Sequence, residues 1–164
     1  MTIGVFYYSR TGNTRKAAEL LVETMKAKDI QVDLVEIEAV RRPGFLSAGS
    51  ASTRQKELPI KNTPGDLGKY GLVVFGVPVW AGNPCPMVKT FLSKVPGRPS
   101  VAAACFLVGG GKPQTQDRAV AILKSWVNEK GFAVRDPVLV LQAGRGGIVG
   151  QSTSLDEFLT AVLP

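Results

Sequence analysis

A run of six residues near the N-terminus combines the side chains that bind phosphate groups most readily. Ser9-Arg10-Thr11-Gly12-Asn13-Thr14 carries three hydroxyls, an amide and a glycine, between an apolar run and a helical pattern. Hydroxyls donate hydrogen bonds to phosphate oxygens, and the backbone N–H groups at a helix N-terminus favour an anion. The run therefore predicts a phosphate-binding turn. The alternative is a simple capped turn, since Asn and Thr are common caps.

Two further segments follow apolar runs and could contact a ligand. Pro78-Val79-Trp80-Ala81-Gly82 places an aromatic ring among residues that favour a loop, and Gly109-Gly110-Gly111 follows the apolar run 101–108. Trp80 could stack on a planar conjugated ring, and the backbone groups of the same segment could bond that ring's polar edge. The alternative is that Trp80 is a core aromatic. A core position is what we predict for the other tryptophan, Trp126, because it lies on an apolar helical stripe.

Several kinds of chemistry are excluded by what the chain lacks. Its 164 residues contain no His, which removes Ser-His-Asp hydrolysis, Cys-His thiol chemistry and His-ligated metals. The two cysteines, Cys85 and Cys105, form no CxxC pair, and we expect them to be packing residues in a reduced, cytoplasmic protein. The predicted phosphate-binding turn, Ser9 to Thr14, matches neither the GxxxxGKS/T nor the GxGxxG pattern, so a P-loop NTPase or a dinucleotide fold is not indicated.

The elements that must position these segments alternate along the chain. Apolar runs predict strands at 3–8, 32–37, 72–77, 101–108 and 134–141, the last with Pro137 as a sign of an edge or bulge. Helical periodicity appears at 14–28, after Asn83-Pro84 (an expected N-cap and first helical residue), around 119–127, and after the S-x-x-E capping box at Ser154. This order predicts one α/β domain over 1–164, with a parallel sheet between helices and an irregular excursion at about 38–69 that contains a short helix near 46–56. In such sheets ligands bind beyond the carboxyl ends of the strands, where the three segments above would lie.

The net charge of +7 is concentrated in the middle of the chain. Residues 41–61 hold five basic side chains and one acidic, and residues 62–100 hold four and one. This excess favours a positive face for an anionic partner or substrate; an ordinary solvated surface is the alternative.

The first two loops resemble those of the flavodoxin family. Ser9 to Thr14 is similar to its S/T-x-T-G-x-T phosphate loop, and Gly76 to Pro84 looks like the second flavin loop of the branch that reads G-x-P-x-W. The resemblance implies a flavodoxin-like three-layer α/β/α sandwich with a five-stranded parallel sheet. It also implies noncovalent FMN, with its phosphate at Ser9, Arg10, Thr11, Gly12, Asn13 and Thr14, and its ring between Pro78, Val79, Trp80, Ala81, Gly82 and Gly109, Gly110, Gly111.

Two departures from the family pattern bear on function. Many flavodoxins place an aromatic in the third loop, whereas Gly109–Gly111 offers none, so one ring face would be open or covered by the 38–69 excursion. Electron-carrier flavodoxins are also typically acidic, and this chain is basic.

The expected function is that of an FMN-binding electron-transfer protein with a redox partner protein of acidic character. The alternative is an NAD(P)H-dependent quinone or flavin reductase, for which the partners are NAD(P)H and quinone. We expect no nucleic-acid partner, because Arg145-Gly146-Gly147 is a single turn rather than a repeated motif. We also expect no membrane span, because no apolar run reaches about 18 residues.

Overall fold

The computed structural model describes residues 1–163, and a mostly parallel β-sheet runs through its centre. The path β2-β1-β3-β5-β7-β8 includes five mutually parallel strands: β1 (Thr2–Tyr7), β2 (Gln31–Glu36), β3 (Leu72–Trp80), β5 (Ala102–Gly109) and β7 (Leu139–Gly144). The predicted α/β class and five parallel strands are confirmed. The structure adds the antiparallel edge strand β8 (Gly147–Gln151) and two short strands, β4 (Asn83–Pro84) beside β3 and β6 (Ala133–Val134) beside β5.

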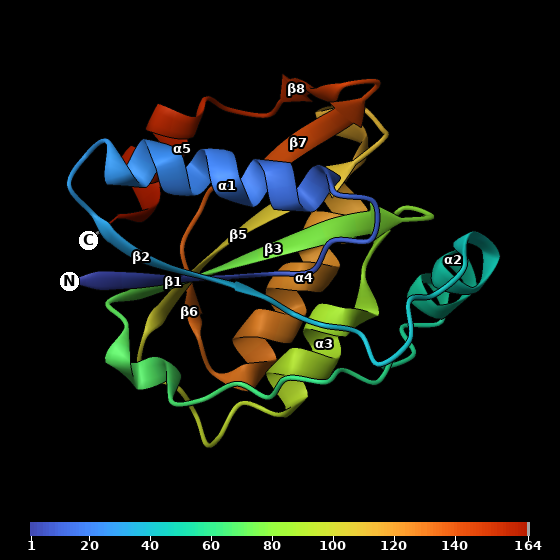
Figure 1. Cartoon of the computed structure of the whole chain (residues 1–164), viewed down its shortest axis with the longest axis horizontal. Coiled ribbons are helices and arrows are strands. Elements are labelled where there is room, and N and C mark those ends of the chain that lie inside the picture. The colour runs from blue at the N-terminus through green and yellow to red at the C-terminus, as the bar shows by residue number, and fades with distance from the viewer. Residues whose placement is uncertain (164) are drawn as a thin grey trace.

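Helices cover both faces of the sheet (Figure 1). The helices α1 (Asn13–Lys26) and α5 (Leu155–Val162) pack on one face, and α3 (Pro86–Ser93) and α4 (Asp117–Lys130) pack on the other. Successive side chains of a strand point to opposite faces, so in β1 Val5 joins the core under α1 and α5 while Phe6 joins the core over α3 and α4. The result is the predicted three-layer sandwich, and it explains why the inner strands read as continuous apolar runs.

Local signals account for several element boundaries. The Ser154 hydroxyl accepts a hydrogen bond from the Glu157 N–H at 3.2 Å, and the Glu157 carboxylate accepts one from the Ser154 N–H at 3.0 Å. This reciprocal pair is the capping box predicted at the start of α5. Gly131, with φ of 109°, ends α4 in the left-handed conformation that glycine adopts without strain.

Two predicted boundaries are wrong. Asn83-Pro84 does not begin a helix: it pairs back onto β3 as β4, and α3 begins at Pro86 after Cys85. The strand predicted over 134–141 is also wrong in its extent, because the Asp136-Pro137 peptide separates β6 from β7. Proline donates no backbone hydrogen bond, so the ladder stops there and resumes at Leu139.

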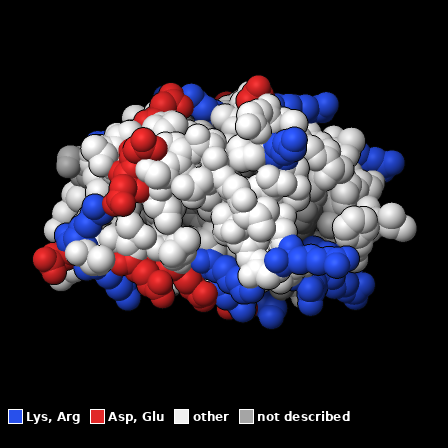
Figure 2. Space-filling model, turned by 90° about the horizontal axis from the view of Figure 1, so that it is seen from above, with Lys and Arg blue, Asp and Glu red and all other residues white. Residues whose placement is uncertain are grey.

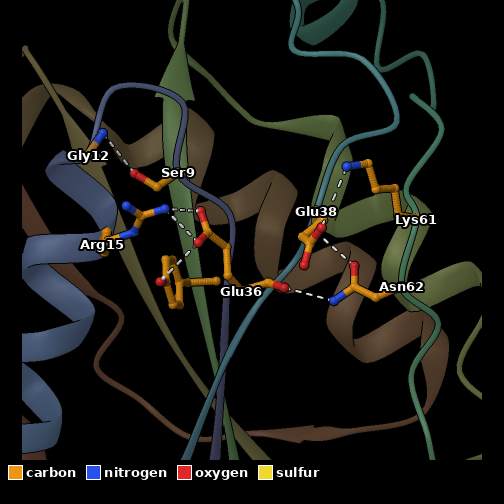
Figure 3. Close-up of polar contacts among 8 residues, drawn as sticks. Ser9, Gly12, Arg15, Glu36, Glu38, Lys61 and Asn62 are labelled. Atoms are coloured by element: carbon orange, nitrogen blue, oxygen red, sulfur yellow. Dashed lines mark hydrogen bonds and ion pairs between the residues drawn. The ribbon is translucent and has the colours of Figure 1, made fainter.

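The excursion between β2 and β3 contains α2 (Phe45–Thr53), close to the short helix predicted near 46–56, and the 3-10 turn η1 (Leu67–Lys69). A second 3-10 turn, η2 (Pro113–Thr115), precedes α4. Figure 1 shows α2 beyond the carboxyl ends of the strands. Asn62 ties the returning chain to the end of β2: its Nδ2 donates to the Glu36 carbonyl at 2.7 Å, and its Oδ1 accepts from the Glu38 N–H at 2.8 Å (Figure 3). The excursion is therefore attached at its return as well as at its start.

Other expectations concern membranes, thiols and domains. Over residues 1–163, none of the helices combines the length and apolar character that crossing a bilayer requires. Cys85 and Cys105 are both buried free thiols, which confirms their role as packing residues. A single domain over 1–164 remains a prediction.

Candidate functional site

A cleft of about 180 Å³ opens beyond the carboxyl ends of β1, β3 and β5. The chain passes from β1 to β2 on one side and then to β3 on the other, so this is where the strand order reverses and where open α/β sheets bind ligands. All three predicted loops reach the cleft. The predicted residues that line it are Arg10, Thr11, Asn13, Thr14, Pro78, Val79, Trp80, Gly109 and Gly110.

The loop after β1 presents unpaired donors to this cleft. Gly12, with φ of 95°, is the N-cap of α1, and within residues 1–163 no side chain caps this helix end. The Lys16 N–H donates to the Gly12 carbonyl at 3.0 Å, so the preceding amides of the first turn have no acceptor within the helix. Together with the hydroxyls of Thr11 and Thr14, these amides form a donor set suited to a phosphate group.

Ser9 supports the loop from behind. Its hydroxyl oxygen accepts a hydrogen bond from the Gly12 N–H at 3.1 Å, which holds the turn closed before α1 begins (Figure 3). Neither Ser9 nor Gly12 lines the cleft itself. Their contribution is to the shape of the turn.

Two arginines lie in this loop and the first turn of α1: Arg15 forms an ion pair with Glu36, and Arg10 lines the cleft. Arg15 donates to both carboxylate oxygens of Glu36, at 2.9 and 2.6 Å, and so points back to β2 (Figure 3). Arg10 is the charged residue among those that line the cleft. Its Nε donates to the Pro43 carbonyl at 3.0 Å, and its guanidinium lies over the Phe45 ring, 5.8 Å from the centroid.

The loop after β3 is a tight hairpin that begins at Trp80. Trp80 pairs with Asn83 in an antiparallel ladder, and the two residues between them, Ala81 and Gly82, have φ of 48° and 73°. Two central residues with positive φ are the pattern of a type I′ turn. Ala81 and Gly82 lie at the tip and do not line the cleft, whereas Trp80, at the end of the strand, does.

Trp80 packs against Tyr8 from the end of β1. Their ring centroids lie 5.8 Å apart, with an interplanar angle of 82°. Tyr8 is buried, and burial is the main cause that raises its pKa from 10.0 to about 12. Its phenol therefore stays neutral at physiological pH. Trp80 itself is half-buried against the core and lines the cleft, while Trp126 lies within the core as predicted.

The loop after β5 lines the cleft with two glycines, Gly109 and Gly110. A Cβ on Gly109 would lie 3.1 Å from the Val79 Cβ, so a side chain there would crowd the neighbouring loop. A Cβ on Gly110 would meet nothing within 4 Å. Gly111 does not line the cleft; a Cβ on it would lie 2.3 Å from the Gln116 Nε2. The missing side chain at Gly109 lets this loop pack closely on Val79, and the missing side chain at Gly110 leaves open space that a flat ligand can use.

Three residues that line the cleft were not predicted: Phe45, Val108 and Ala143. Val108 belongs to β5 and Ala143 to β7. Ala143 was missed because the predicted strand ended at residue 141, whereas β7 extends to Gly144. Phe45 comes from α2, far from the loops in sequence. The available signal was an aromatic residue beside the expected short helix of the basic excursion.

Together, the doubly wound sheet and a cleft with anion donors and an aromatic wall define a flavodoxin-like protein. The family model for flavodoxin matches residues 5–147. The chain belongs to the flavodoxin family.

Solved structures have the same fold at low sequence identity. A Bacteroides eggerthii protein superposes with a TM-score of 0.73 at 20% identity, covering 97% of this chain and 94% of that one. A Lactobacillus acidophilus flavoprotein, solved in complex with FMN, gives 0.65 at 22% identity, covering 81% and 89%. Oxidised flavodoxin 1 from Bacillus cereus gives 0.60 at 16% identity, covering 98% and 93%. The family match supports FMN as the cofactor, and the donor set of the first loop fits its phosphate.

Proposed function

We propose that this protein binds FMN noncovalently in the cleft and passes electrons to and from a redox partner protein. The observation that carries the proposal is the convergence of two kinds of surface in one cleft. The uncapped N-terminus of α1, with Thr11 and Thr14, suits a phosphate, and Trp80 suits a flat conjugated ring. We place the protein in the cytoplasm as part of this proposal, on the ground of its two buried free thiols.

In this proposal the flavin supplies the redox chemistry, and the chain supplies binding, orientation and electrostatics. The amides of the first turn of α1 and the hydroxyls of Thr11 and Thr14 hold the phosphate. Trp80 packs on the ring, and backbone groups of Val79 and Trp80, the residues of this loop that line the cleft with Pro78, bond its polar edge. Gly110, where a side chain would enter open space, allows the ring to approach the third loop closely.

The test compares FMN with riboflavin, which lacks the phosphate. Hydrogen bonds to a charged group are worth about 1.5–3 kcal/mol each, so FMN should bind much more tightly. The double change Thr11→Val and Thr14→Val should narrow the difference between the two ligands. Thr24→Val is the matched control, because the Thr24 hydroxyl bonds the Leu20 carbonyl within α1, away from the cleft. Equal affinity of the wild-type protein for FMN and riboflavin in a fluorescence titration would contradict the phosphate assignment.

A second candidate function is that of an NAD(P)H-dependent quinone or flavin reductase. The basic residues of the excursion favour it, because Arg41 and Arg42 are exposed close to Pro43, which bonds Arg10 at the cleft. Such charges suit the phosphates of a pyridine nucleotide as well as an acidic protein. Stopped-flow mixing of the FMN-loaded protein with NADH or NADPH separates the two functions: rapid bleaching of the flavin absorbance supports a reductase, and very slow bleaching supports a carrier.

A further inference from the structure

The helix α2 brings an exposed aromatic side chain to the cleft. Phe45, its first residue, is 79% exposed and lines the cleft together with Trp80. Its neighbour Leu46 is 85% exposed but does not line the cleft. The loop after β5 offers the cleft no aromatic side chain, because residues 109–111 are all glycine. A ring from the excursion is therefore available where the third loop supplies none.

Phe45 is held in place by contacts with both of the other ligand loops. From the first loop, Arg10 donates to the Pro43 carbonyl and places its guanidinium over the Phe45 ring. At the other end of α2, the fully buried Ser52 hydroxyl donates to the Pro84 carbonyl at 2.9 Å, next to the Trp80 hairpin. Ala48 and Ala51 are buried on the same helix. These contacts attach the two ends of α2 to Arg10 and to the hairpin strand β4, and so hold Phe45 at the rim of the cleft.

We propose that Phe45, supplied by the excursion, is a second aromatic wall of the ring-binding part of the cleft beside Trp80. The inference rests on the proposed function, because the ligand that would cover Phe45 is the conjugated ring. A flat ring packed on Phe45 gains contact area and an aromatic pair, which is the environment that an exposed phenylalanine lacks. The Phe45 side chain has no polar atom, so it contributes to binding of the ring and not of the phosphate.

The test measures dissociation constants for three ligands that share the ring: FMN, riboflavin and lumiflavin. Phe45→Ala should weaken all three by the same factor, about 3- to 10-fold, which is the range expected for one aromatic pair. Phe45→Tyr should retain wild-type affinity. Phe45→Leu, which keeps apolar bulk without a ring, should fall between Tyr and Ala. Leu46→Ala is the matched control and should change none of the three affinities, because Leu46 is also highly exposed on the same helix but lies off the cleft.

Structural damage is separated from loss of a ligand contact by unfolding the ligand-free variants in urea. Phe45 is 79% exposed, so its truncation leaves no core cavity, and the midpoint should stay at the wild-type value. Unchanged affinity of Phe45→Ala for all three ligands overturns the proposal, as does an equal loss in Leu46→Ala. A loss confined to FMN would also overturn it, since it would place Phe45 at the phosphate.

Failure of the proposed function gives a different result from failure of this inference. If the wild-type protein binds none of the three ligands, both are wrong. If it binds lumiflavin as tightly as FMN, the phosphate assignment fails, and the Phe45 series still decides whether the ring wall exists. Thr11→Val with Thr14→Val should change the affinity for FMN alone, whereas Phe45→Ala should change all three affinities in parallel.

Discussion

At the scale of single residues, Trp80 differs from Trp126 in what surrounds it. Trp126 is 6% exposed and belongs to the core over α3 and α4, whereas Trp80 is half-buried and has the cleft beside it. Spacing alone distinguished them, because Trp126 lies on a helical stripe and Trp80 follows a strand between Pro78 and Ala81. The structure adds that Trp80 also packs on Tyr8, a contact that sequence spacing does not reveal.

We predict that Trp80→Ala weakens flavin binding by about 1–2 kcal/mol and lowers the free energy of unfolding of the ligand-free protein by about 1 kcal/mol. The first loss comes from the ring contact and the second from the Tyr8 pair. Trp126→Ala should instead cost about 3–5 kcal/mol of stability because it leaves a core cavity. Isothermal titration with FMN and urea unfolding measure the two quantities. A large loss of stability in Trp80→Ala with unchanged flavin affinity would make Trp80 a core residue.

The site residues that could be predicted from the sequence were those that form a motif with their neighbours in the chain. Ser9 to Thr14 places its hydroxyls and glycine within one turn, and the cleft contains four of these six residues. Phe45 could not be found in this way. It lies far from Trp80 in sequence, and its place at the cleft depends on how Arg10 and Ser52 attach α2 to two distant loops. A contact of that kind depends on the fold and not on spacing.

At the scale of secondary-structure elements, success followed the strength of the local pattern. The strands β1, β3 and β5 are buried on both faces, so their apolar runs were sufficient to predict them. The start of α3 was missed because Asn83-Pro84 has the residue types of a helix start, while the preceding Ala81-Gly82 turn folds it back onto β3. Asn83-Pro84 could either begin a helix or form the second strand of a hairpin. Pairing with β3 decides for the hairpin, and this pairing is not visible in the residue types of Asn83-Pro84 alone.

We predict that α2 loosens when its buried hydroxyl is removed. Ser52→Ala deletes the hydrogen bond to the Pro84 carbonyl and should lower the free energy of unfolding by about 1 kcal/mol. Because this bond joins α2 to the Trp80 hairpin, amide hydrogen exchange should accelerate across Phe45–Thr53. Ser50→Ala is the matched control, since Ser50 is exposed on the same helix, and its exchange should match the wild type. Wild-type exchange in Ser52→Ala would mean that packing of Ala48 and Ala51 alone holds the helix.

At the scale of the whole molecule, we predict that two buried thiols and a buried phenol make the free energy of unfolding fall at alkaline pH. Burial raises the pKa of the Cys105 thiol from 9.0 to about 12 and the pKa of Tyr8 from 10.0 to about 12, and it also raises the pKa of Cys85. The folded protein therefore holds these protons more tightly than the unfolded chain does. As pH rises above about 9, the unfolded chain releases protons first, so the free energy of unfolding should fall steadily toward pH 12. Urea midpoints at pH 7, 9 and 10.5 measure this, and Cys105→Ala should flatten the slope; a midpoint that stays constant would contradict the prediction.

The distribution of charge over the surface bears on the choice between carrier and reductase. Figure 2 shows Lys and Arg atoms gathered toward the lower right, the end of the molecule at which α2 lies in Figure 1. Arg41, Arg42, Arg54 and Lys56 are exposed in or beside the excursion. Exposed charges are screened within about 8 Å at physiological ionic strength, so they act mainly on the rate of encounter and little on stability.

We predict that Arg41→Glu with Arg42→Glu leaves flavin affinity unchanged and changes one of two rates. For a carrier, electron transfer with an acidic [2Fe–2S] ferredoxin as the probe should become slower and lose its dependence on salt, because the attraction between opposite charges is gone. For a reductase, the preference for NADPH over NADH should disappear in steady-state kinetics, because the two arginines no longer meet the extra phosphate.

Lys26→Glu with Lys94→Glu is the matched control: both lysines are exposed, the change in net charge is the same, and Lys26 ends α1 at the opposite end from the cleft. If the control slows the reaction as much as the arginine pair, net charge alone acts. If neither rate responds to salt or to charge reversal, the basic excursion is only a solvated surface, and both uses of it are wrong.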